Sequence, residues 1–116
     1  MEKCLFCDIA AGEEPSEKVW EDGDFVAIKN KYPVAPVHIL VIPKKHVSKV
    51  ELVEDSGSTS ADFWGKMMGA VFATIRQLGL DKTGYKLVNN GAGYNHFDHE
   101  HIHVLGGSKS EPGGRT

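Results

Sequence analysis

The sequence His99-Glu100-His101-Ile102-His103-Val104-Leu105-Gly106-Gly107 has a histidine at every second position, followed by two apolar residues and a glycine pair. Successive side chains of an extended strand point to opposite faces, so the spacing predicts three imidazoles in a row on one strand face. Ile102 and Val104 would then lie on the opposite face and pack into a core. The glycine pair predicts the end of the strand.

A row of imidazoles has a limited set of chemical uses. Imidazole titrates near neutral pH and can act as a nucleophile, a proton shuttle or a metal ligand. Phosphoryl chemistry uses all three roles. A metal-binding tract or an expression tag is the alternative, but a tag is a terminal run of consecutive histidines. These histidines alternate with other residues, so the stretch indicates folded structure with a chemical role.

The composition fits one globular domain. The 116 residues are 41% hydrophobic and 25% charged, which suits a single core and makes a second domain unlikely on size alone. We predict one domain over residues 1–107 and a flexible, polar, glycine-rich tail over residues 108–116. A net charge of -3, without a long basic run, argues against nucleic acid as the primary ligand.

The N-terminal sequence and the cysteine content predict a cytoplasmic protein. No signal-peptide pattern follows Met1, and no run approaches the roughly 20 apolar residues of a membrane-spanning helix. We therefore expect no membrane association. The two cysteines, Cys4 and Cys7, have the spacing of a metal half-site or a redox pair rather than of a disulfide framework.

The remaining chain alternates strand patterns with one long helical pattern. Residues 18–21 and 25–28 flank an Asp-Gly turn and predict a hairpin, and the apolar run 37–42 predicts a central strand. Apolar residues repeat every three or four positions from 60 to 78, which predicts the main helix, with its Met and aromatic stripe packed on a sheet rather than on a cofactor. A further strand is expected at 85–89. The pattern predicts an α+β domain with an antiparallel sheet.

The His-x-His-x-His pattern at residues 99–103 resembles the motif of the histidine triad (HIT) superfamily. Residues 4–9 with 15–16 resemble the N-terminal segment of that family, and residues 35–46 resemble its central strand. The resemblance implies a sheet of about five strands, one long helix and a short N-terminal helix. It also implies a homodimer with two sites.

The resemblance implies that His101 is the nucleophile, which attacks the α-phosphorus of a purine nucleotide derivative and forms a nucleotidyl-histidine. The His101 ring nitrogen that does not react should donate to an acceptor, for which the backbone carbonyl of His99 is expected. His103, His38 and Asn89 match positions that contact the α-phosphate or line its pocket. Taken alone, a histidine at position 38 would more often be a hydrogen-bonded core residue.

Two departures from the family pattern concern the nucleotide site. Asn30 lies where Hint-like relatives carry an Asp that holds the ribose hydroxyls and where Fhit-like relatives carry an Asn, and an amide can still bond a hydroxyl. Asn95 and His96 stand where relatives often have Gln followed by Ser or Thr. His96 could bind phosphate or protonate the leaving group, although a loop histidine is more often a solvated side chain.

A metal site is also implied by the resemblance. Cys4, Cys7, His46 and His99 match the Cys₂His₂ set that closes a tetrahedral zinc site in many relatives. The zinc would be structural, and no organic cofactor is expected. His99 would then tether the catalytic strand to the N-terminal segment.

Three functions remain open from the sequence. The first is a hydrolase or transferase that releases a nucleoside monophosphate from a phosphoramidate or acyl-nucleotide, with Fhit-like dinucleoside polyphosphate hydrolysis as its alternative. The second is a nucleotide-binding or interaction protein with incidental turnover, and the third is a zinc-stabilised interaction module. Asp98 and Glu100 would lie on the strand face opposite the triad, so we interpret both as surface charges.

Overall fold

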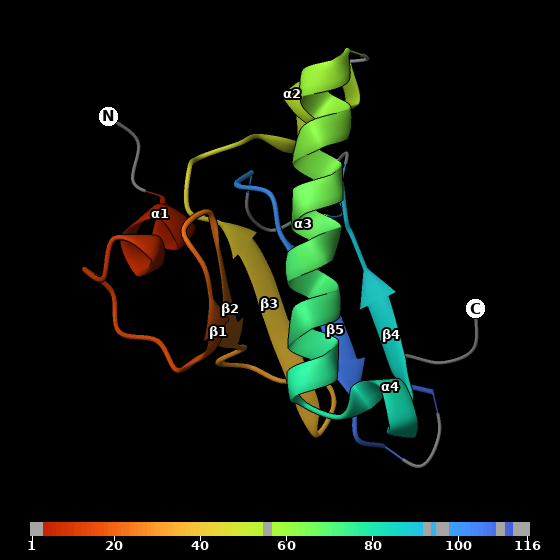
Figure 1. Ribbon diagram of the computed structural model, residues 1–116. Helices are drawn as coiled ribbons and strands as arrows, with labels where there is room; N and C mark the ends of the chain where they lie inside the picture. Colours follow the sequence, from red (N-terminus) through yellow and green to blue (C-terminus); the bar gives the residue numbers. More distant parts are fainter. Residues whose placement is uncertain (1–3, 55–56, 92–93, 95–97, 109–110, 113–116) are drawn as a thin grey trace.

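Five strands form one antiparallel sheet with the order β1-β2-β3-β5-β4 in this computed structural model (Figure 1). The strands are β1 (Lys18–Glu21), β2 (Phe25–Lys29), β3 (Val37–Pro43), β4 (Tyr85–Val88) and β5 (Ile102–Gly106). The helices are α1 (Leu5–Ala10), α2 (Lys49–Glu54), α3 (Ser58–Gln77) and α4 (Leu80–Thr83). The structure describes residues 4–54, 57–91, 94, 98–108 and 111–112. The predicted α+β class, with a five-stranded antiparallel sheet, one long helix and a short N-terminal helix, is confirmed.

Strand β3 lies in the middle of the sheet and aligns two of the histidines. It pairs with β2 on one side and with β5 on the other. The register places His38 opposite Leu105 and Leu40 opposite His103. Residues that face each other across antiparallel strands share a face, as do residues two apart on one strand. His38 and His103 therefore project from the same face of the sheet.

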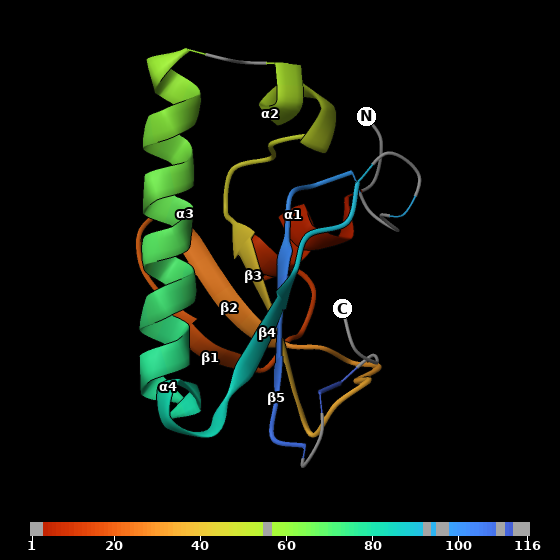
Figure 2. The same ribbon diagram turned by 90° about the vertical axis from the view of Figure 1, so that its right-hand side faces the viewer.

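The two faces of the sheet are covered by different helices. On one face α3 packs against alternate residues of β3 and β5, among them Ile39, Val41, Ile102 and Val104. On the other face α1 packs against Val26, Ile28, Leu40 and Ile42. The two ribbon views show α3 and α1 on opposite sides of the sheet (Figures 1 and 2). The histidine face is thus the α1 face, and only a short helix covers part of it.

Helix α3 confirms the predicted main helix and the packing of its apolar stripe. Met67, Val71 and Ile75 repeat at four-residue intervals and are buried against the sheet. The helix starts two residues before the predicted position 60. It ends at Gln77, and Gly79 just beyond it has a φ of 72°, in the left-handed region that glycine adopts without a steric penalty.

The strand with the triad is shorter than predicted at its start. β5 begins at Ile102, opposite Val41 of β3, and the last two residues of β3, Ile42 and Pro43, pair with β2 and not with β5. The chain before Ile102 instead pairs with the segment that follows β3, through an isolated bridge between Ser48 and His99. The prediction that all three histidines lie on one regular strand is therefore wrong, and His99 and His101 lie on an irregular extension of β5.

Two further predictions concern the chain ends and the membrane. Residues 109–110 and 113–116 of the predicted tail lie outside the described residues, while Lys86 donates to Glu111 Oε2 at 3.0 Å and to the Pro112 carbonyl at 3.2 Å. The domain boundary at residue 107 stays a prediction. Among the described residues, each helix is too short or too polar to cross a bilayer.

Candidate active site and metal centre

The histidine face of the sheet forms part of a pocket of about 1500 Å³. His38 reaches it from β3, His103 from β5 and His101 from the extension just before β5. The pocket also has an apolar wall, formed by Leu5, Phe6, Ile9, Ile28, Leu40 and Leu105. An apolar wall beside a few converging polar groups is typical of sites for small organic ligands.

The hydrogen bond of His101 identifies the nitrogen that carries its proton. Its Nδ1 lies 2.9 Å from the carbonyl oxygen of His99, as expected from the sequence. A carbonyl oxygen only accepts, so Nδ1–H donates and Nε2 of the neutral ring is the unprotonated nitrogen. Phe6 packs edge-on against the ring, with ring centroids 5.1 Å apart. The ring is thus fixed in the tautomer that a nucleophilic Nε2 requires.

His38 and His103 form a hydrogen-bonded pair beside His101. The backbone N–H of Val34 donates to His38 Nδ1 at 3.1 Å, so the proton of neutral His38 resides on Nε2. His38 Nε2 lies 2.9 Å from His103 Nδ1 and donates to it, which places the His103 proton on Nε2. Burial lowers the pKa of His38 below its ordinary value of 6.5, which favours this neutral arrangement.

The predicted nucleotide-binding asparagines have different surroundings. Asn30 lines the pocket, with Nδ2 3.2 Å from His38 Nε2 and Oδ1 accepting from the backbone N–H of Tyr32 at 2.8 Å. The side chain of Asn89 is instead bonded to Lys49 and Glu100, while its neighbour Asn90 lines the pocket. A phosphate contact from Asn89 stays a prediction. Asn95 and His96 lie outside the described residues.

Four side chains predicted as metal ligands come together beside α1. The side-chain donor atoms of Cys4, Cys7, His46 and His99 all lie within 4.8 Å of one another. Each histidine Nδ1 lies 3.3 to 3.4 Å from both cysteine Sγ atoms. Ligand bonds of about 2.0 Å to nitrogen and 2.3 Å to sulfur at tetrahedral angles give similar separations between ligand atoms. The residues therefore fit a closed four-coordinate metal site.

The protonation of these ligands supports the same fit. His99 Nε2 donates to the Pro43 carbonyl at 2.7 Å, so its proton lies on the nitrogen that points away from the sulfurs. Burial lowers the pKa of His99, so this ring is neutral, as a metal ligand must be. Desolvation and the adjacent Cys4 thiol raise the pKa of the Cys7 thiol to about 11. A bound cation would reverse that shift, because it stabilises thiolates.

The reading of Glu100 as a surface charge is wrong. Glu100 is only 2% exposed, and its carboxylate forms an ion pair with Lys49, which is 6% exposed, at 2.5 Å. The strand alternation behind that reading does not hold here, because Glu100 precedes β5. The sequence analysis also missed Lys49, since nothing in its local sequence links it to a residue 51 positions away. Asp98 is exposed, as expected.

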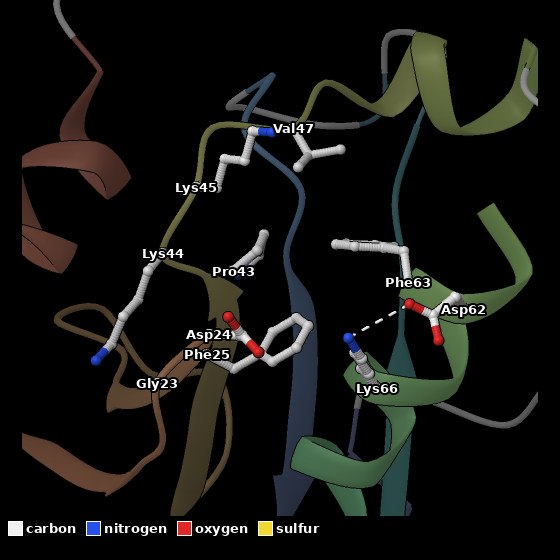
Figure 3. A pocket seen from close by; sticks show the side chains of 10 residues that line it. All are labelled: Gly23, Asp24, Phe25, Pro43, Lys44, Lys45, Val47, Asp62, Phe63 and Lys66. Atoms are coloured by element: carbon white, nitrogen blue, oxygen red, sulfur yellow. Dashed lines mark ion pairs between the residues drawn. The ribbon is translucent and has the colours of Figure 1, made fainter. Parts of the chain in front are cut away.

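A second cavity, of about 480 Å³, lies between α3 and the ends of β2 and β3 (Figure 3). Its lining includes Lys44, Lys45 and Lys66, but none of the histidines. Lys66 pairs with Asp62 at 3.3 Å within this cavity, and Lys44 pairs with Glu21 at 2.7 Å. Two of the three lysines that line this cavity are thus paired with carboxylates.

An α+β fold with an antiparallel sheet and three alternating histidines, of which His101 and His103 line a pocket, defines the class of histidine triad proteins. The family model for the HIT domain matches residues 11–110. Protein HitA of Neisseria gonorrhoeae is 37% identical over 107 residues, which are 91% of this chain and 97% of HitA. The chain belongs to the HIT family.

Solved structures agree with this assignment. A histidine triad protein from Clostridium difficile superposes with a TM-score of 0.82 at 38% identity, over 96% of this chain and 97% of that chain. A HIT family hydrolase from Legionella pneumophila gives 0.82 at 35% identity, over 92% and 95%. The fold is therefore that of the HIT family, which includes the protein from Legionella pneumophila described as a hydrolase.

Proposed function

We propose that this protein cleaves purine nucleotide derivatives at the α-phosphate through a covalent nucleotidyl intermediate on His101. The observation that carries the proposal is the bond from His101 Nδ1–H to the His99 carbonyl, which leaves Nε2 as the unprotonated nitrogen of the neutral ring in a residue that lines the pocket. An imidazole attacks phosphorus only through an unprotonated nitrogen. Phosphoramidates or acyl-nucleotides are the proposed substrates, and a nucleoside monophosphate is the product.

The proposed reaction has two displacement steps at phosphorus. In the first, the lone pair of His101 Nε2 forms a bond to the α-phosphorus, and the leaving group departs with the electron pair of its bond and takes up a proton. In the second, a water oxygen attacks the phosphorus, the bond to Nε2 breaks, and the water proton is released. His101 returns to its neutral form. The His99 carbonyl stabilises the imidazolium that exists between the two steps.

His103 would stabilise the charge that develops on the phosphoryl oxygens, and His38 would fix the orientation of its donor. Because His38 donates to His103 Nδ1, His103 keeps its own proton on Nε2, and both rings line the pocket. A donor fixed in advance needs no reorganisation during the reaction. The apolar wall with Phe6, Ile9 and Ile28 supplies a surface for a purine base, and Asn30 could bond a ribose hydroxyl.

We also propose that zinc is the metal held by the Cys₂His₂ set. Two thiolates and two imidazoles form a soft donor set that favours zinc, and four protein ligands leave no position for substrate. The metal would therefore hold α1 and the segment before β5 together rather than take part in the chemistry. A cytoplasmic location and a homodimer stay predictions.

The test compares the wild-type protein with His101→Ala and the more similar His101→Gln. Each is incubated with an adenosine phosphoramidate and, separately, with a diadenosine polyphosphate, and AMP release and covalent AMP are followed by mass spectrometry. We expect wild-type turnover and an adduct on His101, with a loss of at least about a thousandfold in both variants. Melting temperatures and nucleotide affinity serve as controls for folding.

The same experiment discriminates the alternatives. Preference for the diadenosine substrate would place the protein with the Fhit-like branch, which Asn30 favours by its amide at the ribose position. A wild-type protein that binds nucleotide without forming AMP would overturn the hydrolase proposal in favour of a binding protein. Neither turnover nor nucleotide binding, with unfolding on chelation, would identify a metal-stabilised interaction module.

A further inference from the structure

Lys49 and Glu100 form a buried ion pair directly behind the proposed nucleophile. Lys49 is the first residue of α2, and Glu100 is the residue immediately before His101. Their side chains are 6% and 2% exposed, and the Lys49 Nζ to Glu100 Oε1 distance is 2.5 Å. None of the interactions proposed so far for the substrate or the metal uses either side chain.

The pair is bonded to the backbone on both sides of His101. Glu100 Oε1 accepts from the backbone N–H of His101 at 2.7 Å, and Lys49 Nζ donates to the His101 carbonyl oxygen at 3.4 Å. Asn89 completes the set: its Oδ1 accepts from Lys49 at 2.9 Å, and its Nδ2 donates to Glu100 at 3.2 Å. A charge-assisted network therefore holds the two peptide groups that determine where the His101 ring points.

Backbone pairing brings the two residues together. The isolated bridge between Ser48 and His99 is flanked by a bond from the Glu100 N–H to the Val47 carbonyl at 2.7 Å and one from the Lys49 N–H to the Asp98 carbonyl at 3.3 Å. The segment that carries Lys49 thus lies beside the irregular extension of β5. The network therefore lies beside the residues that precede Ile102, which do not pair with β3.

The energetics indicate a role in geometry rather than in stability. Removing two charges from water costs several kcal/mol per ion, and apolar residues of similar volume often give equal or greater stability. The extension before β5 lacks a regular ladder to fix its orientation, yet His101 Nδ1 must reach the His99 carbonyl within the same stretch. A directional network fixes such a geometry, whereas apolar packing does not.

We propose that Lys49 and Glu100 are positioning residues that hold the His101 backbone so that Nδ1 donates to the His99 carbonyl and Nε2 faces the substrate. The inference rests on the proposed function in so far as it concerns rate. It involves neither the metal ligands nor the proposed contact between His103 and phosphate. It predicts that a protein with apolar residues at both positions still folds but carries out the nucleotidyl-transfer step more slowly.

The test uses the double variant Lys49→Met with Glu100→Leu, which removes both charges and keeps similar volumes. Single variants Lys49→Met and Glu100→Gln accompany it. The first leaves a buried carboxylate without its cation and should unfold at a lower temperature than wild type. The second keeps an oxygen that accepts from the His101 N–H. Val71→Ala, a core change on α3 far from the pocket, is the control for lost stability alone.

We expect the double variant to fold but to melt below wild type, because the His101 N–H and the Asn89 amide lose their partners. The single-turnover rate of His101 nucleotidylation should fall roughly 10 to 100-fold, because small displacements of a reacting atom cost that much. KM should change by less than about threefold, since the substrate contacts remain. Glu100→Gln should lose less rate than the double variant. Val71→Ala should melt lower but react at the wild-type rate.

A readout without substrate separates this inference from the proposed function. Nitrogen-15 NMR of the His101 ring should show one Nδ1–H tautomer in wild type and Val71→Ala, and a mixture of tautomers in the double variant. A double variant with the wild-type rate and a single tautomer would overturn the inference. If the wild-type protein turns over no nucleotide, the proposed function fails and the tautomer measurement alone decides the positioning role.

Discussion

At the scale of single residues, the site is organised by the acceptors and donors that fix each imidazole. His101 and His99 each donate to a backbone carbonyl, and His38 accepts from a backbone N–H. Backbone groups cannot exchange donor for acceptor, so each contact selects one tautomer. Each ring therefore presents a defined nitrogen: His101 is left with an unprotonated Nε2, His99 directs Nδ1 to the cysteine sulfurs, and His38 donates to His103.

The lowered pKa of His38 predicts how stability responds to pH. Between the folded pKa and the unfolded value of about 6.5, the unfolded chain binds more protons than the folded one. The contribution of His38 to the free energy of unfolding is therefore complete above pH 6.5 and is lost as the pH falls below it. We expect the melting temperature of His38→Gln to fall less than that of the wild type when the pH is lowered from 7.5 to 5.5.

Thermal unfolding at both pH values, with the metal content held constant, measures this difference. Protonation of the metal ligands changes the melting temperatures of both proteins equally, so it does not affect the difference between them. His103 and the Asn30 amide face His38, and both remain in the variant. Equal losses of melting temperature in the two proteins would show that His38 titrates alike in the folded and unfolded chains.

The sequence predicted which histidines and cysteines come together better than it predicted their surroundings. The spacing of His99, His101 and His103 and the Cys4-x-x-Cys7 pair were recognisable because their residue types are rare and chemically specific. Glu100 was misread because strand alternation was extended to a segment that leaves the ladder at Ile102. Its partner Lys49 belongs to a helix that the sequence analysis did not predict, so no local pattern connected the two.

At the scale of elements, α1 depends on contacts outside itself. A helix of six residues is too short to be stable alone in water, because its few backbone hydrogen bonds stabilise it by less than the free energy that nucleation costs. Phe6 and Ile9 bury its inner face, and the Cys4 Sγ accepts from the Cys7 N–H at its start. The same two cysteines face His46 and His99, so a metal there would connect α1 to two distant segments.

This connection predicts the effect of removing one thiolate. Cys7→Ser should bind zinc poorly and melt roughly 10 °C or more below the zinc-loaded wild type, because a tightly bound ligand of the folded state contributes several kcal/mol. Mass spectrometry of metal content should give one zinc per wild-type chain. A chelator should lower the melting temperature of the wild type to about that of Cys7→Ser and leave the variant unchanged.

Two results would contradict the metal assignment. One is a wild-type melting temperature that is the same with and without zinc. The other is a Cys7→Ser variant that unfolds with the wild type yet loses nucleotidylation at His101, which would give the thiol a chemical role. Cys7→Ala serves as the matched control, since it also removes the thiol but adds no hydroxyl.

At the scale of the whole molecule, the sheet separates a structural face from a chemical one. The α3 face holds the larger core, and the α1 face holds the pocket. This division was predictable in part, because the period of the α3 sequence gives its buried side, whereas the apolar run of β3 is buried on both faces. The sheet order was not, since the pairing of β3 with β5 joins segments more than 60 residues apart that no local pattern connects.

The sheet order also predicts how two chains would assemble. β4 is an edge strand, since its only partner in the described sheet is β5, and open edges invite further pairing. Tyr85 on β4 is 46% exposed and Phe72 on α3 is 41% exposed. We expect a two-fold dimer through this edge and α3, with twice the 12.7 kDa chain mass by light scattering.

Phe72→Asp should give monomers, because it places a charge in an apolar contact, whereas Val53→Asp, at a position that is 86% exposed on α2, should remain dimeric. A monomeric wild type, or equal masses for the two variants, would exclude an interface through α3.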